Sequence, residues 1–206
     1  MTIRSRREAN RESLRREILD AARPLFVRDG FQATSIRGIA EKAGCSTGIL
    51  YHYFADKQAI VAELVSETFI VLRARLNAIR EDRSPIHDRL RRSLHAYIAF
   101  GLENPHHYSL LFLKTDGWDG DERILNAFRK DGHTTFACLL ALVTEAIEAG
   151  EVRPAIQDPE ELAQSLFVSI HGLVSAQISI RSFPWIEQGR LIERQVDILL
   201  AGIRRH

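Results

Sequence analysis

The residues with the clearest potential for binding chemistry lie in the segment STGILYHYF, which starts at Ser46. Ser46 can cap a helix that begins at Thr47, and Gly48 leaves the first turn of that helix without a side chain. Unpaired backbone N–H groups and the helix dipole attract phosphate at such an end. Tyr51 and Tyr53 each add an apolar ring with a hydroxyl donor. This combination indicates a helix that binds a phosphate-bearing partner.

The elements before this helix must hold it in place at the surface. Ser35 can cap a short helix, IRGIAEKA, that Gly44 ends. Three short helices with a tight glycine-centred turn between the second and third form a helix-turn-helix pattern. Small and apolar residues such as Ala40 suit the close crossing of the second and third helices. Leu50 and Phe54 are expected in the core, which leaves the other face of the third helix free to enter a DNA major groove.

The segment before these helices is basic. Residues 1–57 contain eleven Lys or Arg against seven Asp or Glu, a net charge of +4, whereas residues 58–206 contain seventeen against twenty, a net charge of −3. Such an arm suits a polyanion, because Lys and Arg side chains displace counterions condensed on phosphate. A solvated, frayed terminus is the alternative interpretation. The first sixteen residues hold six arginines: Arg4, Arg6, Arg7, Arg11, Arg15 and Arg16.

The run TSIRGIAEKAGCSTGILYHYFADKQAI, residues 34–60, resembles the signature of the TetR family of transcriptional regulators. The preceding ILDAARPLFVRDGFQATS, residues 18–35, resembles the first helix of that family, so the similarity covers about the first quarter of the chain without a gap. The resemblance implies that Ser35 and Arg37 contact the phosphate backbone and that Lys57 binds a phosphate as a point charge. It also implies a set of residues that face DNA: Thr47, Gly48, Tyr51, Tyr53 and Lys57.

Alternatives stay open at three positions of this region. Tyr51 could be a packed core tyrosine instead of a DNA contact. His52 could contact the flank of the DNA site or simply be exposed. Cys45, in the turn, is interpreted as a small apolar filler, and a redox sensor is the alternative, although no resolving cysteine lies nearby in sequence.

Helix signals dominate the whole chain, and no alternating, β-branched stretch of useful length competes with them. We expect an all-α fold of about nine helices, with a three-helix DNA-binding domain over residues 1–57. Residues 58–206 are expected to form a helical domain for effector binding and dimerisation. Residues 115–123 are predicted to be a loop. A capping residue followed by proline predicts three further helix starts: Ser84-Pro85, Asn104-Pro105 and Asp158-Pro159.

The predicted helix over residues 159–182 is apolar nearly all round, which indicates burial on more than one side. In TetR-like proteins the last two helices form a four-helix bundle with their mates across a two-fold axis. The resemblance therefore implies a homodimer, and a monomeric core is the alternative. The last helix, predicted around residues 186–204, offers Val196, Leu199 and Leu200 to this interface. The helix at 159–182 offers a stripe of small residues that allows close approach: Ser165, Ser169, Gly172, Ala176 and Ser179.

Helices over residues 85–103, 105–114 and 122–149 are expected to enclose an apolar pocket for a drug-sized effector. NPHHYSLLF (104–112) and SLFVSIHGLVSAQ (165–177) resemble a C-terminal subgroup of the family, whose hallmark is a Trp followed by His-Gly. Phe167 stands near the Trp position, and the His-Gly pair is intact. The candidate wall residues, each of which could instead be plain core, are Tyr97, Phe100, Tyr108, Leu111, Phe112, Phe136, Leu140 and His171.

Several functional classes are disfavoured by the sequence. It shows no nucleophile motif or phosphate loop, so we expect no catalytic residues and no cofactor. No stretch approaches the ~20 apolar residues of a membrane span, and the charged N-terminus lacks the apolar segment of a signal peptide, so we expect a cytoplasmic protein. Cys45 and Cys138 form no disulfide framework. No metal is expected, because the histidines that could have held one lack ligand-like spacing: His95, His106, His107, His133 and His171.

Together these features predict a DNA-binding transcriptional regulator. We expect a repressor that a small apolar or aromatic effector releases from a palindromic operator. An architectural DNA-binding protein without a ligand is the alternative from another class.

Overall fold

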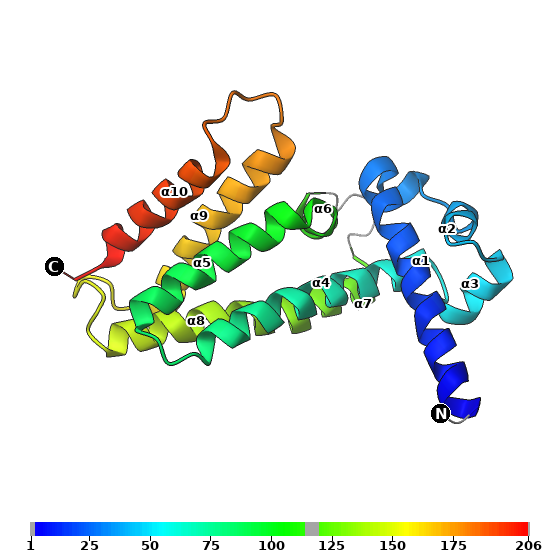
Figure 1. The fold of residues 1–206 in the computed structure, drawn as a ribbon, viewed down its shortest axis with the longest axis horizontal. Coiled ribbons are helices and arrows are strands. Elements are labelled where there is room, and N and C mark those ends of the chain that lie inside the picture. Colours follow the sequence, from blue (N-terminus) through cyan, green and yellow to red (C-terminus); the bar gives the residue numbers. More distant parts are fainter. Residues whose placement is uncertain (1–2, 114–119, 206) are drawn as a thin grey trace. The chain divides into compact units, whose positions relative to one another are not determined.

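The computed structural model describes residues 3–113 and 120–205, with side chains described from residue 11 onward. Within these ranges the chain is helical apart from turns and one isolated bridge between Val152 and Arg204 (Figure 1), which confirms the all-α prediction. The helices are α1 Ile3–Ala33, α2 Ile36–Lys42, α3 Thr47–Tyr53, α4 Lys57–Arg80, α5 Ile86–Glu103, α6 Pro105–Phe112, α7 Glu122–Ala127, α8 His133–Glu148, α9 Pro159–Ser179 and α10 Gln188–Ile203.

The long helix predicted over residues 122–149 contains a π-helical segment. This segment, η1 Phe128–Gly132, joins α7 to α8 without a break, so the described residues form nine separate helical stretches, as predicted. The sequence pattern gave no sign of η1. Gly132 lies against the ring of Phe69, and a Cβ there would stand 3.2 Å from Phe69 Cζ. Of the predicted loop, residues 115–119 lie outside the described residues, and α7 already begins within its last part.

Contacts divide the chain into two compact units. The first unit comprises Met1–Thr68 and His106–Lys130, and the second comprises Phe69–Pro105 and Asp131–His206. In the first unit, α1 packs on α2 and α2 on α3. In the second unit, α5 contacts α8, α9 and α10, and α9 and α10 lie side by side (Figure 1).

Local sequence accounts for most of the helix ends. Ser35 and Ser46 cap α2 and α3, because their hydroxyl oxygens accept from Gly38 N at 3.0 Å and Ile49 N at 3.2 Å. Asp158 caps α9 by accepting from two backbone N–H groups, with Pro159 at the first helical position.

The predicted helix start at Pro105 is confirmed, because α6 begins there, whereas the predicted cap at Ser84 is wrong. Ser84 donates its hydroxyl proton to Asp82, and α5 begins one residue later than predicted, with Pro85 as its cap and no side-chain hydrogen bond. Asn104 Nδ2 donates to the carbonyl of Phe100, so Asn104 completes the C-terminus of α5. At Ser84 the nearby carboxylate of Asp82 competes successfully for the side chain.

A charge cluster around the buried Arg23 connects α1, α4 and α6 in the first unit. Arg23, on α1, is 9% exposed and donates to Asp20 at 3.0 Å and to Glu67 of α4 at 3.1 Å. Its Nε is buried and has no hydrogen-bond partner among the described residues. Burial raises the pKa of Glu67, against the lowering effect of Arg23. Burial, followed by the charges of Arg23 and His106, lowers the pKa of His107 on α6 from 6.5 to about 4.

The His107 pKa predicts a pH dependence of stability. The folded protein takes up this proton only near pH 4, whereas the unfolded chain takes it up near pH 6.5, because folding depresses the pKa. Unfolding therefore binds a proton between these values, so this contribution to stability is complete above about pH 6.5 and is lost as the pH falls toward about 4. Thermal unfolding across this range should show a larger decrease in Tm for the wild type than for His107→Gln. Equal decreases in the two proteins would show that His107 is not held neutral.

Candidate nucleic-acid interface and effector site

The short helix α3 has one buried and one exposed face. Leu50 is 0% exposed and Phe54, its C-terminal cap, is 3% exposed, as predicted for the face that packs on the unit. Tyr51 is 55% exposed. Ile49, which sequence analysis did not select, is also strongly exposed on this helix. The exposed face therefore combines aromatic and aliphatic surface with polar groups at the helix start, and it also includes Thr47, Gly48 and His52.

The turn before α3 depends on Gly44. Its φ of +68° lies in the left-handed region, which an L side chain rarely adopts. The following residue, Cys45, donates its backbone N–H to the carbonyl of Ala40 at 3.0 Å, which closes the turn. Burial raises the pKa of the Cys45 thiol, so the neutral thiol is favoured. The observed turn fits the interpretation of Cys45 as a filler.

The start of α2 offers a second polar group. Ser35 is exposed, but its hydroxyl oxygen already accepts the capping hydrogen bond of α2. The hydroxyl group can still donate its proton to an acceptor on a partner. Arg37 is exposed and forms no ion pair with the residues that the structure describes. Tyr53 is half-buried at the end of α3, with the Arg11 guanidinium 6.0 Å from its ring centre.

Lys57 lies differently from what the sequence suggests. Its ammonium points at the end of α1 and donates to the carbonyls of Phe31 at 2.6 Å, Thr34 at 2.8 Å and Gln32 at 3.4 Å. It also stands 4.4 Å from the centre of the Phe31 ring. Burial lowers its pKa. A phosphate contact by Lys57 stays a prediction, but the structure gives this side chain an internal role that residue type alone did not reveal.

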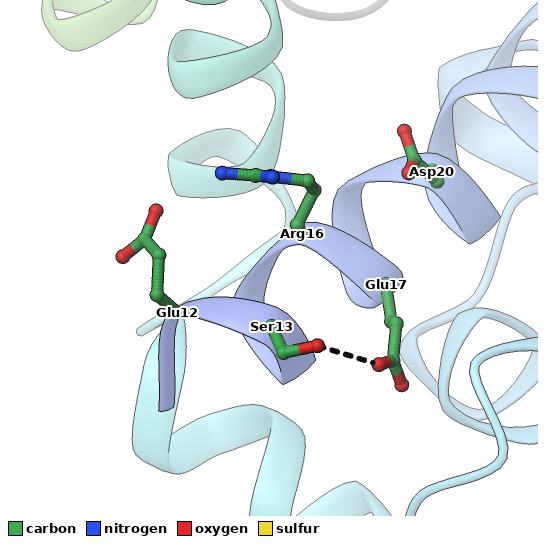
Figure 2. Close-up of a pocket in the computed structure, with 5 residues that line it drawn as sticks. All are labelled: Glu12, Ser13, Arg16, Glu17 and Asp20. Carbon is green, nitrogen blue, oxygen red and sulfur yellow. Dashed lines mark hydrogen bonds between the residues drawn. The ribbon is translucent and has the colours of Figure 1, made fainter. Parts of the chain in front are cut away.

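The basic arm is less uniformly positive than its arginine count suggests. The side chains of Arg4, Arg6 and Arg7 lie outside the described residues. Arg15 forms an ion pair with Glu63. Arg16 lines a hollow on α1 (Figure 2). The other residues around this hollow contribute one hydroxyl and three carboxylates: Ser13, Glu12, Glu17 and Asp20. The Ser13 hydroxyl donates to Glu17 at 3.1 Å. This part of the arm carries a net negative charge and does not suit a polyanion.

The candidate effector residues fall into both units. In the second unit, Tyr97 and His171 Nδ1 share a hydrogen bond of 2.9 Å. Phe167 brings the group together, because its ring lies 5.6 Å from Tyr97, 6.2 Å from Phe136 and 5.3 Å from His171. The sequence marks Phe167 only through the family resemblance, near the Trp position, and not as a pocket residue. Burial lowers the pKa of His171, which favours a neutral ring.

The other candidates have more ordinary surroundings. Phe100 is buried, with the Arg75 guanidinium 5.6 Å from its ring centre. Leu140, on α8, is half-buried. In the first unit, Tyr108 and Leu111 are buried on α6, and the Tyr108 and Phe112 rings lie 5.0 Å apart. Among the residues that the structure describes, no three His, Cys, Asp or Glu side chains gather as a metal site would require.

The predicted interface stripe on α9 is open in the protomer. Ser165, Gly172 and Ser179 are exposed, Ser169 and Ala176 are half-buried, and a Cβ built on Gly172 meets nothing within 4 Å. Val196 and Leu200 are 0% and 1% exposed, so they pack inside the protomer, which corrects their assignment to a surface offered to a partner. Leu199 is half-buried. The strongly exposed apolar residues of these helices are instead Val168 and Ile198, at 64% and 58%.

Comparison with known proteins places both parts of the chain. The family model described as bacterial regulatory proteins of the TetR family matches residues 18–64. The model described as the tetracyclin repressor-like C-terminal domain matches residues 90–199. No helix in the described ranges has the length and apolar character needed to cross a membrane.

Individual relatives agree with these matches. The uncharacterized HTH-type transcriptional regulator YhgD of Bacillus subtilis is 22% identical over 143 residues, 69% of this chain and 73% of YhgD. The HTH-type transcriptional repressor KstR2 of Mycobacterium tuberculosis is 45% identical over 53 residues, 26% of each chain.

Solved structures share the fold across nearly the whole chain. FadR of Bacillus subtilis, in complex with stearoyl-CoA, has a TM-score of 0.78 at 19% identity and covers 91% of this chain and 98% of its own. The ketosteroid transcriptional regulator KstR2 of Mycobacterium tuberculosis has a TM-score of 0.71 at 23% identity and covers 93% and 95%. The chain belongs to the TetR family of bacterial regulatory proteins and is a DNA-binding transcriptional regulator.

Proposed function

We propose that this protein is a homodimeric repressor that leaves a palindromic operator when a small apolar or aromatic effector binds. The exposed face of α3, with Tyr51 55% exposed beside buried Leu50, is the observation that carries the DNA contact. Two such helices would enter successive major grooves about 34–36 Å apart. Ser35 and Arg37 at the start of α2 would contact phosphate. A regulator of chromosomal DNA would act in the cytoplasm.

The open stripe on α9 supports the dimer. In a helix that is apolar nearly all round, the exposed Val168 and the small residues beside it form a face that the protomer leaves uncovered. Exposed apolar surface of this kind marks protein interfaces. With α10 alongside and Ile198 exposed on it, a second copy of the chain would cover both helices.

The aromatic cluster supports an apolar effector. Phe136, Phe167 and His171 keep part of their surface exposed although they contact one another within the second unit. The Tyr97–His171 hydrogen bond supplies one polar pair among these rings. A sugar or nucleotide would leave many polar groups unpaired against such a wall. Fatty acyl and steroid compounds are the first candidates, because one structural relative holds stearoyl-CoA and another is a ketosteroid regulator.

The DNA contact predicts that Tyr51→Ala weakens binding to an operator selected from random duplexes by the wild-type protein. We expect about a tenfold loss or more, equivalent to about 1.4 kcal/mol. Tyr51→Phe, which keeps the ring, should lose less. Fluorescence anisotropy measures both, and an unrelated duplex reports nonspecific binding. Wild-type operator affinity in Tyr51→Ala would refute α3 as the recognition helix.

The interface predicts that Gly172→Leu shifts the protein toward monomer. Because the protomer leaves open space at this position, a leucine should fold normally there and clash only with a partner helix. Light scattering across a concentration series reports the mass, and circular dichroism confirms helix content. Gly172→Ala is the graded control and should have a smaller effect. A monomeric wild type at micromolar concentration, or a fully dimeric Gly172→Leu, would contradict this interface.

The effector site predicts that fatty acyl or steroid probes raise the Tm and release operator, whereas sugars and nucleotides do neither. Release requires a higher affinity for the conformation that does not bind DNA. Phe167→Ala should reduce both responses, whereas Phe183→Ala, an exposed phenylalanine outside the cluster, should leave them intact. Stabilisation by apolar probes without operator release would leave a DNA-binding protein whose ligand site does not control it.

A further inference from the structure

The ammonium of Lys57 has all of its donors engaged inside the protein. An ammonium carries three N–H donors, and three backbone carbonyls lie within 3.4 Å of Nζ, those of Phe31, Gln32 and Thr34. The Phe31 ring lies against the same charge, with its centre 4.4 Å away. A phosphate oxygen would have to displace one of these partners.

These carbonyls face Lys57 because of how α1 ends. Gly30 has φ +80° and ψ 168°, so the regular helix is interrupted there and the last turn bends away. The carbonyls that follow lack the helical partners of an interior turn and carry the partial negative charge of a helix C-terminus. Thr34 closes part of this turn, donating its hydroxyl proton to the carbonyl of Gly30 at 2.7 Å and its N–H to the same oxygen at 3.3 Å. The ammonium satisfies the carbonyls of Phe31, Gln32 and Thr34.

The turn held by Lys57 leads directly into the start of α2. Thr34, one of its acceptors, precedes Ser35, the cap of α2, and Arg37 lies in the first turn of that helix. We infer that Lys57 is a positioning residue for DNA binding, which fixes the turn from α1 into α2 and thereby places Ser35 and Arg37. The inference rests on the proposed DNA contacts of those two residues. It assigns Lys57 no phosphate of its own.

The geometry of the site makes a specific demand on the side chain. A compact ammonium can direct three protons at three carbonyls around it, whereas a planar guanidinium directs its donors in one fixed plane. Arginine at this position would therefore keep the charge but lose the arrangement. Methionine would keep the apolar stem against Phe31 and remove all three donors.

Hydrogen exchange in the free protein tests the internal role without DNA. Lys57→Met and Lys57→Arg should both speed amide exchange over residues 31–38, roughly tenfold or more, because hydrogen bonds to a charged donor are lost. Lys42→Met, which removes an exposed lysine of α2, is the matched control and should leave this segment as in the wild type. Unchanged exchange in both Lys57 variants would overturn the inference. If Lys57→Met does not fold, Lys57→Arg carries the test.

A double-mutant cycle on DNA separates positioning from direct contact. If Lys57 acts through the start of α2, Lys57→Met should weaken operator binding, and combining it with Arg37→Met should add little to either single loss. The salt dependence of the double variant should then equal that of Arg37→Met. Additive losses, a further decrease of about one in the salt slope, and wild-type affinity in Lys57→Arg would instead show a phosphate contact. Tyr51→Ala serves as the reference, because failure of that variant to weaken binding would refute the proposed surface and not this role of Lys57.

Discussion

Two adjacent side chains at the start of α4, those of Asp56 and Lys57, connect α4 to the start of α7 and to the end of α1 within the first unit. Asp56 caps α4 through Oδ1, which accepts from Ala59 N at 2.8 Å, while its Oδ2 accepts from Arg123 at 2.9 Å, at the start of α7. Lys57 then donates to the carbonyls at the end of α1. Helix α3 ends at Tyr53, only three residues before Asp56. Helix α3, the proposed recognition helix, is therefore short, and groups just outside it help to set its position. Because the Asp56–Arg123 pair is exposed, it contributes little to stability, and the more buried ammonium is the firmer of the two connections.

The sequence predicted those helix ends that a side chain determines locally. Ser35, Ser46 and Asp158 each cap the next N–H groups along the chain, and no competing acceptor or donor diverts them. Ser84 has the same residue type as Ser35 and Ser46 but donates to Asp82 and caps no helix. Whether a residue of a type that favours caps does cap a helix therefore depends on which other donors and acceptors lie beside it. The segment η1 left no pattern at all, because a π turn adds one residue to the helical repeat without changing which residue types can occupy it.

The candidate site likewise has some features that the sequence shows and others that it does not. Buried Leu50 and exposed Tyr51 follow from helical spacing, which sequence shows directly. The acceptors of Lys57 are backbone carbonyls, and a carbonyl is present at every residue, so sequence cannot mark them. When a helix is apolar nearly all round, its sequence does not show which face packs on which neighbour. Phe167 was therefore missed as the centre of the aromatic cluster. Val196 and Leu200 share the apolar face of α10, but helical spacing does not show whether that face packs inside the chain or on a partner; both residues are buried within the chain, whereas Ile198 points outward.

Charge counted along the chain overestimates the charge that this surface can offer to DNA. Arg15 is paired with Glu63, Arg23 with Asp20 and Glu67, and Arg16 lies among the carboxylates of the hollow on α1. Among the described residues, Arg37 keeps its guanidinium outside any ion pair. Each phosphate neutralised by a free cation adds about one to the salt slope, whereas a cation that is already paired inside the protein adds less. Backbone N–H groups at helix starts and the exposed aromatic face of α3 would contribute to the proposed DNA contact beside these cations. The affinity of the proposed surface would therefore depend on the accurate placement of α2 and α3 and not simply on the number of arginines before them.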